Sequence, residues 1–169
     1  PMGASVFAGG LFAADSSLQK AAGKVVDKEW LFDRYMEASY GYMNSILVRT
    51  IIEESGRTVD WLIENGCKLN LVDAGTGGSF AHVGMPATLH GYAEGGKVAI
   101  NKLIESFKNN GGQVMFSTPA TELIKDSEGN VKGVVAKKED GTTLEIYAKA
   151  VILATGGFGG NEEMMRQVF

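Results

Sequence analysis

The chain places a buried-strand pattern, a glycine cluster and the start of a helix close to its C-terminal end. Residues 149–164 read KAVILATGGFGGNEEM, and five residues follow them. The run AVILAT shows no alternation of apolar and polar residues, which predicts a strand buried on both faces, as in a parallel sheet. A buried strand, a glycine loop and a helix in this order are typical of nucleotide-binding units, whose ligands lie beyond the strand ends. This feature constrains the fold most, because it predicts an α/β protein.

The glycine cluster does not complete a dinucleotide-binding fingerprint. From Gly157 the chain reads GFGGNE, whereas the G-x-G-x-x-G fingerprint needs a third glycine and an acidic residue about twenty positions later. The backbone at Gly156 and Gly157 could still approach the ribose or pyrophosphate of a nucleotide. The alternative is a glycine turn that serves only to pack the helix on the strand. The missing third glycine also disfavours a nicotinamide-dependent enzyme.

Two helices and a long glycine-rich loop are predicted in the first part of the chain. Residues 28–38 read as a helix, and apolar residues recur at roughly helical spacing over 45–65. Gly56 leaves open the alternative that the second segment is two helices broken near this residue. Residues 74–96 hold many glycines and both histidines with little periodicity. Loops of this length inside compact domains are usually functional or mobile.

The remaining segments predict close backbone contacts, a third helix and several strands. The opening stretch GASVFAGGLFAA consists of small residues, so its backbone could approach a helix, a strand or a ligand closely. A helix is predicted after Gly95-Gly96, where its first N–H groups could face an anion, and it stops at Asn110-Gly111. Hairpin-like turns indicate an antiparallel meander that precedes the buried strand. The predicted strands are 113–118, 120–126, 131–138, 143–149 and 150–155.

Composition and charge exclude several classes of protein. Hydrophobic residues make up 44% of the chain and charged residues 21%, as in ordinary globular domains. The net charge of −4 argues against nucleic acid and an acidic membrane surface as partners, and no apolar run approaches the roughly 18 residues that cross a bilayer. The single cysteine, Cys67, excludes an internal disulfide and a cysteine-based zinc site, and it favours a reducing compartment such as the cytoplasm. We expect Cys67, Trp30 and Trp61 to be packed residues.

Several segments together resemble one family in their order and spacing. Gly3-Ala4 and Ala8-Gly9-Gly10 are followed by TVDWLIENG, by a glycine pair before a helix, by STPATELIKDSEGNVKGVV and by AKAVILATGGFGGNEEM. The chain resembles the FAD-binding subunit of fumarate reductases and succinate dehydrogenases, especially the soluble branch with flavocytochrome fumarate reductases, urocanate reductase and ketosteroid dehydrogenases. The resemblance runs along nearly all of the chain. It implies a partial FAD-binding, Rossmann-like α/β domain with a parallel sheet, an antiparallel β-meander and flanking helices.

The resemblance implies FAD as the cofactor of the intact protein, held mostly by backbone contacts. Family members often have Asn and then Ser or Thr where this chain has Gly3 and Ala4, so those side-chain donors are missing here. The positions that match the flavin side are Gly3, Ala4, Gly9 and Gly10. The positions that match the nucleotide side are Ala120 beside the adenine, and Ala154, Thr155 and Gly156 beside the ribose and pyrophosphate.

The resemblance also implies why the glycine loop comes so late. In the family the dinucleotide fingerprint precedes such a segment, and a capping domain follows the ATGG turn. Residues 1–169 therefore match the middle portion of a single FAD-binding domain that lacks both parts. We expect this chain alone to bind FAD weakly or not at all, to be inactive, and to expose sheet edges that favour self-association.

The implied activity is hydride transfer between flavin and an activated C=C bond, or its saturated form, in a small-molecule substrate. The family's catalytic arginine and most of its carboxylate-binding residues lie beyond residue 169, so we assign no catalytic residue, and no metal ligand. We expect His82 and His90 to be satisfied or surface histidines rather than ligands. Dicarboxylate, urocanate-like and steroid-like substrates stay open. So does a stand-alone ligand-binding or interaction module without flavin.

Overall fold

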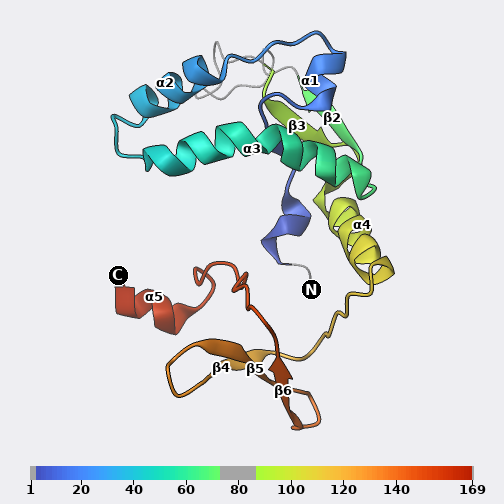
Figure 1. Ribbon diagram of the computed structural model, residues 1–169, viewed down its shortest axis with the longest axis vertical. Coiled ribbons are helices and arrows are strands. Elements are labelled where there is room, and N and C mark those ends of the chain that lie inside the picture. Colours follow the sequence, from blue (N-terminus) through green and yellow to red (C-terminus); the bar gives the residue numbers. More distant parts are fainter. Residues whose placement is uncertain (1–2, 73–86, 169) are drawn as a thin grey trace. The chain divides into compact units, whose positions relative to one another are not determined.

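The computed structural model describes residues 3–72 and 87–168, and the chain divides into two compact units. The first unit comprises residues 1–112 and the second comprises residues 113–169. Both contain helices and strands (Figure 1). None of the described helices is long and apolar enough to cross a membrane.

The first unit contains a three-stranded antiparallel sheet. Its strands are β1 (Gly10–Phe12), β2 (Leu69–Val72) and β3 (Leu89–Tyr92), in the order β1-β3-β2. β3 falls within the stretch predicted to be an irregular loop, so that prediction is wrong for residues 89–92. Its partner strands β1 and β2 are not joined to it by a short turn, so the residues around 89–92 show no hairpin pattern that would predict the pairing. Residues 73–86 of the same stretch lie outside the described residues.

The helices of the first unit follow local sequence signals. They are the 3-10 helix η1 (Ala4–Phe7) and the α-helices α1 (Ser17–Ala21), α2 (Lys28–Ala38), α3 (Ser45–Glu64) and α4 (Gly95–Asn109). Asp27 and Asn44 cap α2 and α3, because their side chains accept hydrogen bonds from backbone N–H groups in the first turn, both at 3.0 Å. The three predicted helices are thus confirmed to within a residue or two. α2 lies alongside the first half of α3 (Figure 1).

Gly56 does not break α3, which rules out the alternative of two helices. A Cβ atom at this position would lie 2.3 Å from the carbonyl oxygen of Ala14 and 2.8 Å from that of Asp15. The neighbouring Ser55 hydroxyl accepts a hydrogen bond from the Ala14 N–H at 3.0 Å. The glycine therefore lets the backbone at residues 14–15 lie directly against the helix.

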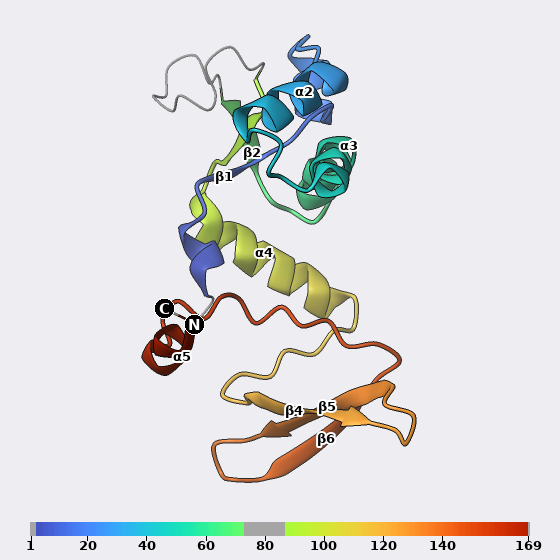
Figure 2. The same ribbon diagram turned by 90° about the vertical axis from the view of Figure 1, so that its left-hand side faces the viewer.

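A second glycine brings the N-terminal segment against α4. A Cβ atom at Gly96 would lie 2.5 Å from the carbonyl oxygen of Ser5 and 2.8 Å from that of Ala8. η1 consequently lies beside the first turn of α4 (Figure 2). The prediction that the small N-terminal residues approach a helix closely is confirmed. At Gly96, in the first turn of α4, the space beside the helix is filled by backbone atoms of Ser5 and Ala8.

Two apolar clusters form the core of the first unit, and α3 contributes to both. The first contains Ala13, Val59, Leu62, Cys67, Leu69 and Ala99, and the second contains Ala14, Leu31 and Ile52. Ala13 and Ala14 follow β1 and enter different clusters, so the chain after β1 is fixed on two sides. Cys67 is buried as expected.

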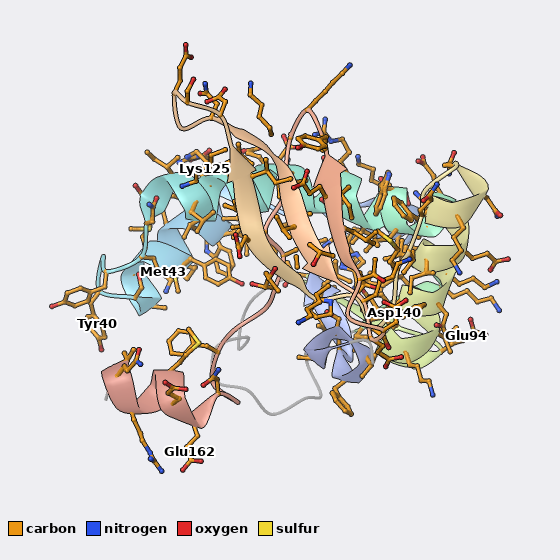
Figure 3. The ribbon with its side chains drawn as sticks, turned by 90° about the horizontal axis from the view of Figure 1, so that it is seen from below. Tyr40, Met43, Glu94, Lys125, Asp140 and Glu162 are labelled. Carbon is orange, nitrogen blue, oxygen red and sulfur yellow. The ribbon has the colours of Figure 1, made fainter. Side chains whose placement is uncertain are left out.

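Several large apolar side chains of the first unit are exposed. Trp30 and Trp61 retain 36% and 53% of their accessible surface, so the prediction that they are core residues is wrong: each lies on the outer face of a helix whose other face packs. Tyr40 and Met43 lie at the connection between α2 and α3, with their side chains on the outside (Figure 3).

The second unit is built on the predicted antiparallel meander. Its strands are β4 (Ala120–Lys125), β5 (Val131–Lys137) and β6 (Thr143–Tyr147), in the order β4-β5-β6, and α5 (Glu162–Val168) follows. In the first turn, one carboxylate oxygen of Asp126 accepts the N–H groups of Glu128 and Asn130 at 3.0 and 2.9 Å. This local hydrogen bonding explains why the sequence predicted the turn correctly.

Two predicted strands of the second unit do not form. Residues 113–118 are irregular, and Ser117 has a φ of 50°, which is incompatible with an extended strand. The run 150–155 is unpaired, and Ile152 and Leu153 are 90% and 68% exposed. A doubly buried parallel strand needs neighbours that this unit does not supply, and all strand pairs in the described residues are antiparallel. The expected parallel strand is therefore corrected to an exposed extended segment.

Replacing Gly56 with alanine is expected to lower the free energy of unfolding of the first unit by about 1–3 kcal/mol, because the new methyl group overlaps the Ala14 carbonyl. In an unobstructed helix the same change raises stability by roughly 1 kcal/mol. Urea unfolding followed by tryptophan fluorescence measures the effect, since both tryptophans lie in this unit. Thr58→Ala, at an exposed position of α3, is the matched control. Equal stabilisation by both substitutions would contradict the close contact.

Candidate functional site

The residues predicted to contact a cofactor fall into two groups. Gly3, Ala4, Gly9 and Gly10 lie in the first unit, around η1 and the start of β1, and Ala120, Ala154, Thr155 and Gly156 lie in the second unit. The structure thus brings the first four together on one short segment. Ala120 begins β4, while residues 154–156 belong to the exposed segment without secondary structure that follows β6.

β1 presents an open row of backbone polar groups. Among the described strands it pairs only with β3, and this pairing is flanked by hydrogen bonds from Tyr92 N–H to Gly9 C=O at 2.9 Å and from Ala13 N–H to Thr88 C=O at 2.8 Å. Bonded and non-bonded residues alternate along an antiparallel pair. The N–H and C=O groups of Gly10 and Phe12 therefore point to the opposite edge, which is unpaired among the described strands.

Three of the four glycines at the predicted contact positions leave room for a ligand, whereas a Cβ atom at Gly10 would lie 2.4 Å from the carbonyl oxygen of His90. No atom lies within 4 Å of where a Cβ atom would stand at Gly3, Gly9, Gly156 or Gly157. Gly3 and Gly156 also have positive φ angles of 62° and 76°, which side-chain-bearing residues rarely adopt. Flat rings and phosphates could therefore reach these backbone groups directly. This arrangement fits a large cofactor bound through main-chain atoms.

The predicted strand, glycine loop and helix near the C-terminus are present in part. The strand is missing, but the loop ends in a turn closed by a hydrogen bond from Asn161 N–H to Phe158 C=O at 2.8 Å. The Asn161 side chain then accepts the Met164 N–H at 3.0 Å and begins α5. α5 is a short helix of 7 residues.

A buried polar cluster lies behind β1 and was not predicted. It consists of Ser16, Gln19, Thr88 and His90, whose side chains are buried. The Gln19 amide donates to the carbonyls of Ala13 at 3.0 Å and Ala87 at 2.6 Å. Ser16 and Gln19 also form a capping box at the start of α1. The Ser-x-x-Gln spacing at 16–19 is the signal that could have indicated this helix start.

His90 completes the cluster from the central strand. Its Nδ1 atom lies 3.2 Å from the Thr88 carbonyl oxygen and its Nε2 atom lies 2.7 Å from the Ser16 hydroxyl. A carbonyl only accepts, so Nδ1 carries the proton and Nε2 accepts from Ser16. Burial lowers the pKa of His90, while the Thr88 carbonyl and the charge of Asp60 oppose this shift. His90 is thus a satisfied, neutral core histidine, as expected. His82 lies outside the described residues.

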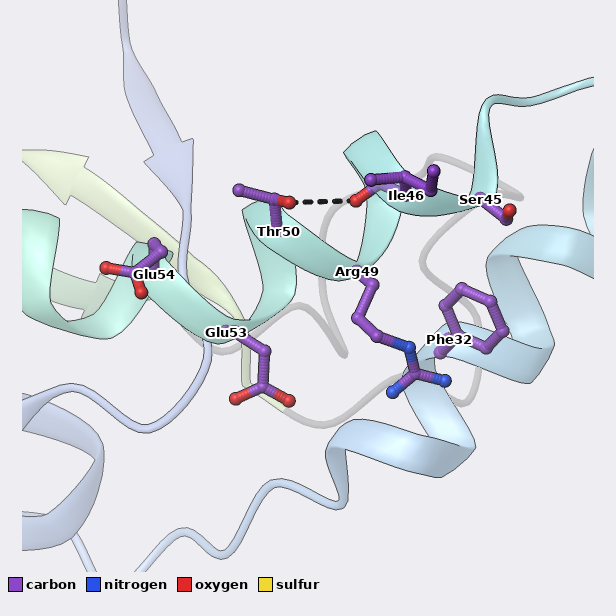
Figure 4. A pocket seen from close by; sticks show the side chains of 7 residues that line it. All are labelled: Phe32, Ser45, Ile46, Arg49, Thr50, Glu53 and Glu54. Carbon is purple, nitrogen blue, oxygen red and sulfur yellow. Dashed lines mark hydrogen bonds between the residues drawn. The ribbon is translucent and has the colours of Figure 1, made fainter.

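A hollow between α2 and α3 does not offer an anion site. It is lined by Phe32, Ser45, Ile46, Arg49, Thr50, Glu53 and Glu54 (Figure 4). The Arg49 guanidinium stacks 4.1 Å from the centre of the Phe32 ring and donates to both carboxylate oxygens of Glu29 at 2.7 and 3.2 Å. These hydrogen bonds from Arg49 lower the pKa of Glu29. The charge of Arg49 is therefore already paired. Over residues 3–72 and 87–168, no group of acidic, histidine or cysteine side chains could hold a metal ion.

Comparison with known proteins identifies the family. The sequence profile of a family described as FAD binding domain matches residues 2–168. The chain belongs to this family of FAD-binding domains. The predicted family and the predicted cofactor, FAD in the intact protein, are confirmed. The main-chain groups at the glycine positions described above are suited to such a cofactor.

Relatives and solved structures agree with this membership. The chain is 31% identical over 166 residues to a fumarate reductase (cytochrome) of Shewanella frigidimarina, covering 98% of this chain and 28% of that protein. It is 30% identical over 168 residues to a vinyl phenol reductase of Lactiplantibacillus plantarum, covering 98% and 33%. A flavocytochrome c3 fumarate reductase in an open conformation superposes with a TM-score of 0.79 at 28% identity, covering 95% and 28%. The fold class, a partial FAD-binding α/β domain, is thereby confirmed.

The FAD-binding domain described here is a part of what its relatives contain. The chain spans a third or less of the length of the curated relatives that it matches. The same holds for the flavocytochrome c3 structure.

Acidification is expected to destabilise the first unit through His90. Its pKa is lowered in the folded state, so the unfolded chain takes up the proton first, near pH 6.5. The stability is therefore full above about pH 6.5 and is lost as the pH falls towards the folded-state pKa, by up to about 1.4 kcal/mol per pH unit. Urea unfolding between about pH 7.5 and 5.5 measures this slope. His90→Gln should remove that part of it, and an unchanged slope in this variant would contradict the assignment.

Proposed function

We propose that the protein containing this chain is an FAD-dependent oxidoreductase that reduces an activated C=C bond in a small molecule, or oxidises the saturated form. The observation that carries the proposal is the family match over residues 2–168. Relatives named as fumarate, vinyl phenol and urocanate reductases add support, at 31%, 30% and 36% identity. FAD, when bound, would supply or accept the hydride.

We propose that this chain's part in the reaction is to hold the cofactor. The backbone around Gly3, Ala4, Gly9 and Gly10 would lie along the flavin, where the open edge of β1 offers the N–H and C=O groups of Gly10 and Phe12. In the second unit, Ala120 would contact the adenine. The exposed segment at 154–156 would contact the ribose and pyrophosphate through main-chain atoms, since glycine at position 156 leaves the approach open.

Residues 1–169 would form the middle portion of a single FAD-binding domain. Because the chain spans a third or less of its relatives, we place the dinucleotide fingerprint, the capping domain and the catalytic residues in other parts of the protein. The chain alone would then be inactive and would self-associate through exposed apolar residues such as Ile152 and Leu153. Light scattering of the isolated chain measures its mass, and a strictly monomeric chain would contradict self-association.

The test of the function is an absorption spectrum and FAD titration of the intact protein beside the 169-residue chain. We expect stoichiometric flavin in the intact protein and weak or no binding by the chain. Activity is then assayed with a reduced dye as electron donor and fumarate, urocanate, acrylate or a vinyl phenol as acceptor. An intact protein that binds no flavin would contradict the proposal and favour a ligand-binding or interaction module without flavin. Flavin without turnover of any C=C acceptor would leave only the cofactor assignment standing.

Replacing Gly156 with valine in the intact protein is expected to weaken FAD binding by about tenfold or more, equivalent to about 1.4 kcal/mol. The branched side chain would strain the positive φ of 76° and stand in the open space beside the Gly156 backbone. Gly141→Val is the matched control, because Gly141 also has a positive φ, 85°, and open space around it, but lies in the turn between β5 and β6. Equal losses of FAD affinity in the two variants would contradict a contact at Gly156.

A further inference from the structure

The position of β1 is specified only in part by its own sequence, because Leu11 and Phe12 pack against the two core clusters but Gly10 contributes no side chain. It has three residues, begins with a glycine that follows another glycine, and pairs with one neighbouring strand. Strands rich in glycine have few side chains to fix their register, so pairing can slip. A slip by one residue would exchange the backbone groups that face β3 with those on the open edge. Restraints from outside β1 therefore add to those that set which groups face outward.

Gln19 supplies one such restraint. Its amide nitrogen donates to Ala13 C=O, directly after β1, and to Ala87 C=O, shortly before β3. The two carbonyls belong to segments that pair through the Ala13 N–H to Thr88 C=O hydrogen bond. The side chain therefore adds a rung at the end of the β1–β3 ladder. Its remaining polar atom, Oε1, accepts the Ser16 N–H at 2.8 Å, so every hydrogen-bonding group of the amide head has a partner.

His90 and Ser16 supply a second restraint on the same strand. His90 lies opposite Leu11, the middle residue of β1, and its ring reaches the Ser16 hydroxyl, which also accepts the Gln19 N–H at 3.2 Å. The chain from β1 to α1 is thus tied to the central strand by side chains as well as by the ladder. All three side chains are fully buried, with 0% exposure, so none of them can touch a cofactor or a substrate.

We propose that Ser16, Gln19 and His90 are positioning residues for the cofactor: they fix the register of β1 so that the backbone groups of Gly10 and Phe12 face the flavin. The inference rests on the proposed function, because it takes the open edge of β1 as a contact surface for FAD. It assigns to the cluster a role that goes beyond holding the core together. Loss of the cluster should change how flavin is held even in protein that remains folded.

The decisive variant is Gln19→Glu in the intact protein. Glutamate has nearly the same shape, but a buried carboxyl group can donate at most one hydrogen bond, in its protonated form, so at least one of the two carbonyls loses its partner. An unsatisfied buried group costs about as much as a tenfold change in an equilibrium. We expect the dissociation constant for FAD to rise by about tenfold, with a shift in the flavin absorption maximum and midpoint potential.

A second pair of variants keeps the test usable if the Gln19→Glu protein does not fold. His90→Gln retains an acceptor for Ser16 and should bind FAD almost normally, while His90→Leu should not.

Leu62→Ala is the control for a purely structural effect, since Leu62 is buried in the first core cluster and its apolar side chain makes no hydrogen bond to Ser16, Gln19 or His90. It is expected to lower the melting temperature but to leave the FAD affinity and the potential of the folded protein unchanged. The inference is overturned if the wild type binds FAD and the Gln19 and His90 variants match this control, or if His90→Gln and His90→Leu behave alike. Absence of FAD from the wild type would overturn the proposed function as well, so the two failures are distinguishable.

Discussion

Close contact between backbone segments is the constraint on which the first unit depends. The chain from η1 to α1 runs past α4, β3 and α3, and at each passage a glycine removes the Cβ atom that would block it. Gly96, Gly10 and Gly56 play this part, with contacts that would fall between 2.3 and 2.5 Å from an added Cβ atom. Protein interiors are packed too tightly to absorb such overlaps. The glycines therefore decide where the N-terminal segment lies, and with it the edge of β1.

The hydrogen bonds of the buried polar cluster restrict how far the segment after β1 can shift along its neighbours. Apolar contacts of Ala13 and Ala14 hold the segment after β1 in place, but such contacts tolerate small shifts along the strand. Hydrogen bonds have fixed partners and are costly to leave unmade in a buried setting. Ser16, Gln19 and His90 thus turn a well-packed segment into one with a single register. A buried network is not the only case: in the second unit, the side chain of Asp126 likewise orders a turn by accepting two backbone N–H groups.

The features that the sequence predicted correctly depend on neighbouring residues. The helix at 45–65 shows in the spacing of its apolar residues, and the meander shows in its turns. β3 and the unpaired segment 150–155 were predicted wrongly because a strand depends on distant partners. The cofactor-binding residues were predicted from the resemblance to a family, because contacts made by the backbone of glycine do not require a recognisable side chain. The buried cluster was missed because Ser16 and His90 lie 74 residues apart.

The order of the strands along the chain has a consequence for synthesis on the ribosome. β1 emerges first but cannot pair until β3 follows, about 80 residues later, which takes roughly 4–16 seconds at ordinary rates of translation. α2 and α3 can pack during that interval, since they are adjacent in sequence. The waiting segment is rich in glycine and alanine, a composition that is a poor template for aggregation. The small residues around β1 therefore also lower the risk that this segment aggregates before β3 has been synthesised.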